Sequence, residues 1–100
     1  MNIEYLNMNK NIYFEFPKET FILTILNYLN LKWSKFKVLP KEIENLINLK
    51  KLYLSYNALR ALPKEIGNLI NLTHLKLSHN KLTELPKEVG NLINLFKCFL

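Results

Sequence analysis

The feature that most constrains this chain is a segment of eleven residues that occurs three times. The copies read LPKEIENLINL at residues 39–49, LPKEIGNLINL at 62–72 and LPKEVGNLINL at 85–95, which gives a period of 23 residues. A fixed period of this length is typical of a solenoid, in which each unit buries one thin apolar face against its neighbours. The repeats therefore predict a stacked core that no single unit could form.

The same period continues toward the N-terminus in a more diverged form. One period before residue 39 the chain reads FPKETFILTILNYLNLKWSKFKV, which keeps the letters PKE and the spaced leucines. The apolar residues of the first 15 positions fall in the same register. We therefore expect a single domain over residues 1–100, composed of a half repeat 1–15, repeats 16–38, 39–61 and 62–84, and an incomplete repeat 85–100.

The aligned part of each unit follows the pattern LxxLxLxxNxL. Successive units read IEYLNMNKNIY, LNYLNLKWSKF, LKKLYLSYNAL and LTHLKLSHNKL, and the last breaks off as LFKCFL. Together with LPxEIGNLxNL, this pattern resembles the leucine-rich repeat family over essentially the whole chain. The resemblance implies an α/β solenoid: a curved parallel sheet of about five short strands, with short helices or helical turns on the convex side. It also implies binding of a protein partner through the concave face.

Within one unit, alternation of residue types predicts a strand with one buried face. Leu52 and Leu54 alternate with polar and aromatic residues, so we expect the two leucines to point inward. The residues expected to point outward are Lys51, Tyr53 and Ser55. The letters LPKEIGNL that follow suit a short helix or helical turn, because proline and glutamate favour the first turn of a helix. We expect it to close near Gly67 or Asn68.

An asparagine column follows the strands. Asn11, Asn57 and Asn80 occupy equivalent positions, where amide side chains can bond backbone groups exposed by the turn. We interpret these three residues as a structural ladder. Ser34 occupies the same column in the diverged unit and has a shorter reach.

Positive charge is concentrated in the predicted strand segments. The chain has a net charge of +6, and its strand segments hold eight lysines against one acid, Glu4. The lysines are Lys10, Lys32, Lys35, Lys50, Lys51, Lys76, Lys81 and Lys97. The PKE letters of the convex side neutralise themselves, since each lysine precedes a glutamate. The excess charge therefore belongs mainly to the concave side, where it favours an acidic partner.

The outward strand positions also carry aromatic residues, which are common anchors of protein interfaces. The residues that we expect to bind a partner are Tyr28, Trp33, Lys51, Tyr53, Tyr56, His74, Lys76 and His79. The alternative for this surface is an ordinary solvated face. Trp33 has a second alternative of its own, which is packing over the imperfect turn of a diverged repeat.

The residue patterns argue against an enzyme, a metal site or a cofactor. Ser78 and His79 are adjacent, yet side chains of successive strand residues diverge and the chain has no aspartate to orient an imidazole. Two histidines, His74 and His79, lack a third zinc ligand. Cys98 occupies a leucine column, which predicts a small buried apolar residue. One glycine per repeat does not make a phosphate-binding loop.

Length and composition indicate one small domain that is not a disulfide-stapled secreted scaffold. The chain has 100 residues and a single cysteine, so it cannot form an internal disulfide. No apolar run reaches the length of a membrane span, and the apolar segment at residues 21–31 begins too late for a secretion signal. We expect a cytoplasmic protein, although a fragment of a longer secreted chain would look the same.

The sequence thus predicts a protein–protein interaction module that binds a partner with an acidic surface. One alternative is an uncapped fragment of a larger repeat protein with no ligand of its own, because neither end shows a capping unit. Uncapped ends could also pair with another copy of the chain. A nucleic-acid surface is a further alternative, but a single arginine and the Asn and Ser residues between the lysines argue against it.

Overall fold

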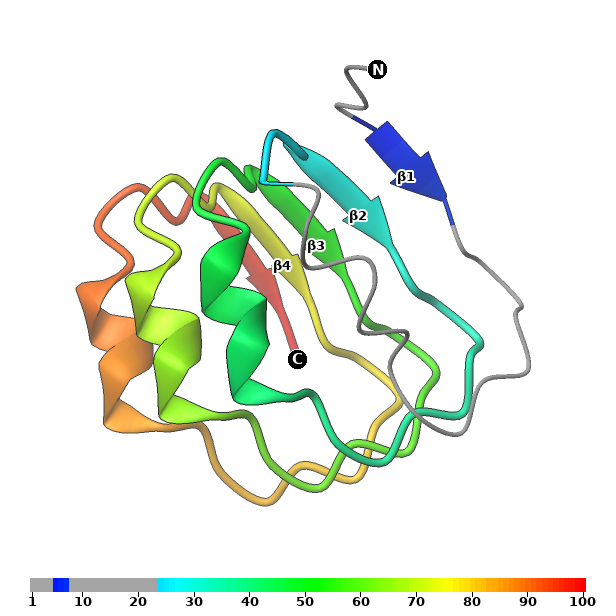
Figure 1. Cartoon of the computed structure of the whole chain (residues 1–100). Coiled ribbons are helices and arrows are strands. Elements are labelled where there is room, and N and C mark those ends of the chain that lie inside the picture. The colour runs from blue at the N-terminus through cyan, green and yellow to red at the C-terminus, as the bar shows by residue number, and fades with distance from the viewer. Residues whose placement is uncertain (1–4, 8–23) are drawn as a thin grey trace.

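The computed structural model describes residues 5–7 and 24–100, and these form a parallel sheet with helical turns on one side (Figure 1). The strands are β1 (Tyr5–Asn7), β2 (Tyr28–Asn30), β3 (Lys51–Tyr53), β4 (His74–Lys76) and β5 (Lys97–Phe99). Three 3₁₀ helices complete the described elements, namely η2 (Lys41–Asn45), η3 (Lys64–Asn68) and η4 (Lys87–Asn91). This architecture confirms the predicted leucine-rich repeat solenoid.

The strands lie side by side in chain order, and each pairs with the next in parallel. The register advances by one repeat at each step, so that Tyr28 lies beside Lys51, Lys51 beside His74, and His74 beside Lys97. Backbone bonds continue the ladder past the strand ends, since the amide of Leu54 donates to the carbonyl oxygen of Lys76 at 2.8 Å. Equivalent residues of successive units therefore form straight rows across the sheet.

The three helical turns begin after a proline for a local reason. Pro63 has extended backbone angles, φ −69° and ψ 148°, and its carbonyl oxygen accepts a bond from the amide of Ile66 at 3.1 Å. Proline suits this position because its φ is already fixed and it has no amide to satisfy. The proline stands one residue before the turn rather than inside it. The turn ends at Asn68, which agrees with the expected closure.

The core lies between the sheet and the helical turns. The central leucines of the strands, Leu29, Leu52 and Leu75, are fully buried, as are Ile43 and Ile66 of the helices. Complete burial of such a side chain contributes roughly 1.5–3 kcal/mol relative to exposure. Each unit supplies the same apolar positions, so the core is a continuous column that runs along the stack.

The column thins at β5 and η4. Several apolar residues of the last units are only partly buried, namely Leu82, Leu85, Val89 and Leu95. Their counterparts one unit earlier, such as Leu59 and Leu62, are buried. The difference arises because the earlier residues are covered by a following unit, whereas the later ones lie beside the edge strand.

Asparagine side chains close the turns that follow β3 and β4. The Asn57 side chain donates to the carbonyl oxygens of Leu31 and Leu54, both at 2.9 Å, and its Oδ1 accepts from the amides of Ser34 and Phe36 at 3.0 Å. Asn80 repeats these contacts one unit later, with bonds to Leu54 and Leu77. Each amide thus ties its own turn to the unit before. Asn11 lies outside the described residues.

Ser34, which replaces asparagine in this column, bonds within its own turn and to the next unit. Its hydroxyl donates to the carbonyl oxygen of Lys32 at 3.3 Å. Its own amide is held by Asn57 of the next unit. The longer asparagine side chain of the following repeat therefore stabilises the turn of the diverged one.

Candidate functional site

The sheet face that points away from the helices carries most of the residues expected to bind a partner. We call it the concave face, and Figure 1 shows it on the side of the sheet opposite η2, η3 and η4. One row across it holds Tyr5, Tyr28, Lys51, His74 and Lys97, and the next row holds Asn7, Asn30, Tyr53, Lys76 and Phe99. The fold therefore brings Tyr28, Lys51, Tyr53, His74 and Lys76 together on one surface.

The first part of the concave face is a tyrosine cluster. The rings of Tyr5 and Tyr28 stack at 4.1 Å, and Tyr28 meets Tyr53 edge-on at 5.1 Å. Partial burial and a hydrogen bond with the Tyr5 side chain raise the pKa of Tyr28 to about 12. The hydroxyl of Tyr28 therefore stays protonated at neutral pH and can donate a hydrogen bond.

Two lysines contact Tyr53, the last ring of this cluster. The ammonium of Lys76 lies 4.5 Å from the ring centroid of Tyr53, and that of Lys32 lies 5.3 Å from it. A cation at this distance is attracted by the negative face of the ring. Tyr53 therefore keeps the ammonium groups of Lys32 and Lys76 near the concave face, where both can attract an acidic group of a ligand.

A second set of rings lies just beyond the strands. Trp33, Tyr56 and His79 stack in succession, with centroids 3.9 Å and 4.2 Å apart and ring planes within 8° of parallel. Trp33 is 51% exposed and Tyr56 is 37% exposed. The remaining three expected binding residues thus form one row, which we call the ring row.

The backbone of the ring row is unusual. Trp33, Tyr56 and His79 have φ angles of 60°, 61° and 59°, in the left-handed region that residues with a side chain rarely adopt. This conformation costs roughly 1–2 kcal/mol per residue, and stacking of adjacent rings returns roughly 0.5–1.5 kcal/mol. For Trp33 the stacking shows a packing contact, while half of its surface stays open to a partner.

His74 is the centre of the positive part of the concave face. Partial desolvation and the nearby charges of Lys51, Lys97 and Lys76 lower its pKa. Its Nδ1 lies 2.9 Å from the hydroxyl oxygen of Thr73, and its ring centroid lies 6.0 Å from that of Phe96. The positive surroundings therefore oppose protonation of the imidazole, which lies between Lys51 and Lys97 in the strand register.

Two sequence expectations about individual residues are wrong. Ser55 was expected to point outward, yet it is 3% exposed, because it lies between neighbouring units with its hydroxyl 3.2 Å from that of Ser78. Cys98 was expected to be buried, yet it is exposed. It pairs in register with Leu75, but β5 is the edge strand of the described sheet and nothing there covers it. Its partial contact with the protein still raises the pKa of the thiol.

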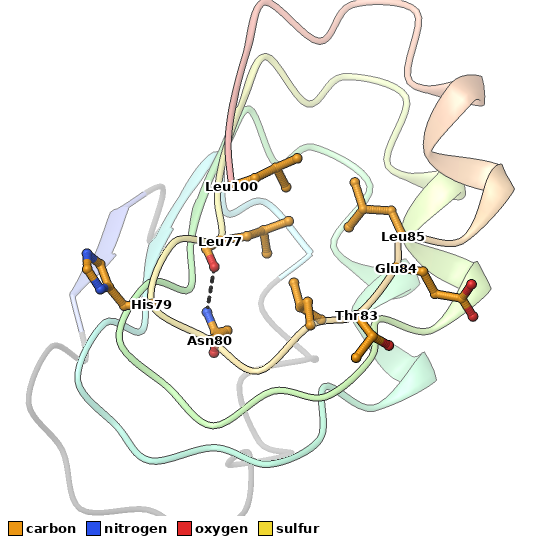
Figure 2. A pocket seen from close by; sticks show the side chains of 8 residues that line it. Leu77, His79, Asn80, Thr83, Glu84, Leu85 and Leu100 are labelled. Atoms are coloured by element: carbon orange, nitrogen blue, oxygen red, sulfur yellow. Dashed lines mark hydrogen bonds between the residues drawn. The ribbon is translucent and has the colours of Figure 1, made fainter.

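A pocket that the sequence did not reveal opens at the edge of the stack (Figure 2). Its volume is about 410 Å³, and its lining includes Leu77, Leu82, Leu85 and Leu100. The bond from Asn80 to the carbonyl oxygen of Leu77 crosses its wall at 2.9 Å. The uncovered leucine columns are the signal that could have predicted it.

Two kinds of site are not formed by the described part of the chain. Within residues 5–7 and 24–100, no three His, Cys, Asp or Glu side chains are grouped so that they could hold a metal ion. No helix in the same residues is long and apolar enough to cross a membrane. Ser78 and His79 do not approach as a pair: the serine hydroxyl faces Ser55, and the imidazole stacks on Tyr56.

The repeat fold and the rows of the concave face define a leucine-rich repeat protein, and comparison with known proteins shows the same. The family model described as leucine rich repeat matches residues 47–97, and the chain belongs to this family. No curated protein matches the chain.

Similar solved structures come from bacteria and a plant. A leucine-rich repeat protein of Leptospira interrogans is 45% identical over 93% of this chain, with a TM-score of 0.88. The leucine-rich repeat ectodomain of the Arabidopsis thaliana membrane receptor kinase GASSHO1/SCHENGEN3, solved in complex with CASPARIAN STRIP INTEGRITY FACTOR 2, is 37% identical over 93% of it, with a TM-score of 0.83.

A third similar structure is internalin C2 of Listeria monocytogenes, which is 26% identical over 96% of this chain, with a TM-score of 0.79. The chain spans 24%, 12% and 40% of the lengths of these three proteins, in the order given. The alignments therefore compare this chain with a part of each longer solenoid.

Proposed function

We propose that this chain is a protein-interaction module whose concave face binds a partner with an acidic surface. The observation that carries the proposal is the composition of that face. Strands β2 to β5 have the sequences YLN, KLY, HLK and KCF, which include lysine, histidine and aromatic residues and no acid. The glutamates Glu42, Glu65 and Glu88 lie in the helical turns of the opposite side.

The two kinds of side chain have different roles in this proposal. Lys51 and Lys76 accelerate encounter with an acidic partner and suppress binding of basic ones. Tyr28, Tyr53, Tyr56 and the partly exposed Trp33 provide rigid contact area, which gives much of the affinity of a protein interface. The Arabidopsis neighbour was solved with a bound factor, which supports a binding role for this fold.

The proposal is tested by selecting binders from a random displayed peptide library on the immobilised full chain. Binding of the selected peptides is then measured by fluorescence anisotropy with the variant K51E/K76E. We expect acidic peptides to be enriched and their affinity to fall by about tenfold or more in this variant, since two attractive contacts become repulsive. Circular dichroism checks that the variant is folded.

The matched control is K41E/K64E, which makes the same change of charge on the convex side. Lys41 and Lys64 are exposed residues of η2 and η3. We expect it to retain the affinity of the unchanged chain within about twofold, because exposed charges beyond the interface are screened. Equal losses in both variants would mean that net charge, not the concave face, determines binding.

Two other outcomes would overturn the proposal. Binding to random oligonucleotides that falls steeply between about 0.05 and 0.2 M salt would indicate a nucleic-acid surface. Failure to enrich any peptide, with a folded chain in solution, would favour a fragment of a larger protein with no ligand of its own. Light scattering on the same sample shows whether copies of the chain associate.

Three further statements from the sequence stay predictions. The chain is expected not to be an enzyme and to need no cofactor, in keeping with a family of binding scaffolds. It is expected to act in the cytoplasm. Residues 1–100 are expected to fold as one domain with the repeat division given above, which limited proteolysis of the full chain would test.

A further inference from the structure

We propose that the concave surface around His74 binds two carboxylates carried on alternate residues of an extended segment of the partner. This inference rests on the proposed function and deepens it by naming the group that is recognised. The site consists of His74 on β4, Lys51 on β3, Lys97 on β5 and Lys76 two positions from His74 on the same strand.

The register places the four groups in a compact pattern. Lys51, His74 and Lys97 are direct neighbours across three parallel strands. Parallel strands lie about 4.8 Å apart, so the two lysines begin about 10 Å from one another with the histidine between them. Lys76 lies two positions along β4 from His74 and so projects from the same face of the sheet. The result is a row of positive groups rather than a single point of charge.

Hydrogen bonding fixes the histidine at the centre of this row. The Thr73 hydroxyl lies 2.9 Å from the carbonyl oxygen of Lys50 and must donate its only proton there. The contact of 2.9 Å between the same hydroxyl oxygen and Nδ1 of His74 is then a bond donated by the imidazole. Nε2 is the nitrogen left for a ligand, and it donates to a carboxylate once the ring is protonated.

The spacing of the row selects the geometry of the ligand. In an extended segment, side chains of alternate residues share a face and lie about 7 Å apart, whereas adjacent residues point to opposite faces. Two carboxylates about 7 Å apart fall between Lys51 and Lys97, and the flexible lysine stems can close on both. Same-face residues four apart, at about 14 Å, overshoot the row. A single phosphate would engage one point and leave the outer lysine without a ligand.

Binding of the carboxylate pair is expected to take up a proton. The charged groups that face His74 are Lys51 from β3, Lys97 from β5 and Lys76 from β4, and all three oppose its protonation. Two bound carboxylates offset the positive charge around His74 and so favour its protonated, imidazolium form. Affinity for the pair therefore rises as pH falls from about 7.5 to 5.5, a range in which glutamate itself remains charged.

The test uses the full chain and short synthetic peptides, with amide NMR shifts as the readout. The probe is an extended threonine-rich peptide with glutamate at two alternate positions. The comparison peptides carry two adjacent glutamates, two alternate glutamines, or one phosphothreonine. At about 1 mM peptide we expect shifts at Lys51, His74 and Lys97 with the alternate pair, and binding at least about threefold weaker with adjacent glutamates.

Two variants complete the test. H74Q keeps a polar side chain of similar size and is expected to remove the pH dependence of binding while the lysines still attract the peptide. K51A/K97A is expected to lose most binding, whereas K64A/K87A on the convex side retains it. Folding of each variant is checked by its amide spectrum, and H74Q alone is sufficient if the double variant does not fold.

Three results would overturn the inference. The first is that the peptide with alternate glutamates causes no NMR shift at His74. The second is that adjacent and alternate glutamates bind equally well. The third is that the phosphothreonine peptide binds more tightly than the peptide with alternate glutamates. Each leaves the broader function standing if library peptides still depend on Lys51 and Lys76. Loss of that dependence, in contrast, would refute the proposed function itself.

Discussion

The convex and concave sides of this solenoid are built from the same three units, yet they differ in how far the units vary. On the convex side, residues 39–49, 62–72 and 85–95 differ from one another at only two of eleven positions. On the concave side, the row that begins with Tyr5 and Tyr28 continues with Lys51, His74 and Lys97, so the type of side chain changes at each of the last three steps.

Packing explains the contrast. Each helical turn lies against the next, and the apolar residue of each turn must fill the same space in the core. A change there is felt by the units on both sides. The concave side chains point away from the core and contact mainly their row neighbours, so they can vary without affecting the stack. Variation therefore occurs on the face that we propose binds a partner.

The largest expected effect lies in the turn that joins the two faces. Asn57→Ala removes three donated and two accepted bonds, which hold the turn together and tie it to the unit before. We expect the free energy of unfolding to fall by about 3 kcal/mol. Urea denaturation followed by circular dichroism measures this change.

Asn48→Ala is the matched control, because the exposed Asn48 side chain donates one bond, to the carbonyl oxygen of Thr24 at 2.8 Å. We expect a loss below about 1 kcal/mol. If both variants lost the same amount, the asparagine ladder would not be the element that connects the convex and concave sides.

A smaller effect on stability is expected at two glycines of the convex side, Gly67 and Gly90. A Cβ added at Gly67 would lie 2.6 Å from the carbonyl oxygen of Glu88, whereas one added at Gly90 meets nothing within 4 Å. We expect Gly67→Ala to destabilise the protein by about 1 kcal/mol, because the backbone of the next unit must move. Gly90→Ala should stabilise it by about 0.5 kcal/mol through a less flexible unfolded chain.

Thermal unfolding of the two glycine variants, side by side, measures the difference. Glu44 occupies the equivalent position one unit earlier, which shows that a unit can accept a side chain there when its neighbour is suitably placed. A stabilising Gly67→Ala would mean that the convex stack adjusts more easily than its uniform sequence indicates.

The smallest effect concerns the pKa of His74 on the concave side. Removal of one neighbouring charge in Lys51→Ala should raise this pKa, while Lys64→Ala on the convex side should leave it unchanged. Because the pKa in the folded state is below its usual value, the unfolded chain binds more protons just below pH 6.5. Stability therefore decreases as pH falls through that value. An NMR titration of the imidazole reports the pKa directly, and a value that does not respond to Lys51→Ala would contradict the assigned cause.

The periodicity predicted the fold because it counts positions, and position determines which face a residue occupies. Leucines recurring at fixed steps gave the buried column, and the letters between them gave the rows of the concave face. The asparagine ladder could also be predicted, because Asn57 and Asn80 occupy the same position of the repeat. Periodicity does not show how many neighbouring units cover a residue. For this reason the exposure of Cys98 was not predicted.

The ring row shows a second limit of the sequence. Tyr56 and His79 are 23 residues apart and so occupy the same position of the repeat. Adjacent strands lie about 4.8 Å apart, a spacing from which stacking of the two rings could have been predicted. Their left-handed backbone could not be predicted, because aromatic residue types do not favour it. The burial of Ser55 was equally hidden, since it depends on how closely the adjacent unit approaches.

The hydrogen bonds between units join residues about one repeat apart, as in the bond from Asn71 to the carbonyl oxygen of Ile47 across 24 positions. This pattern has a consequence for how the protein can change in evolution. A duplication or deletion of one whole unit shifts every downstream residue by the same number of positions and returns each bond to an equivalent partner. Gain or loss of one whole unit can therefore lengthen or shorten such a protein in one event. The size of the concave face can then change over generations while the arrangement of the core is inherited unchanged.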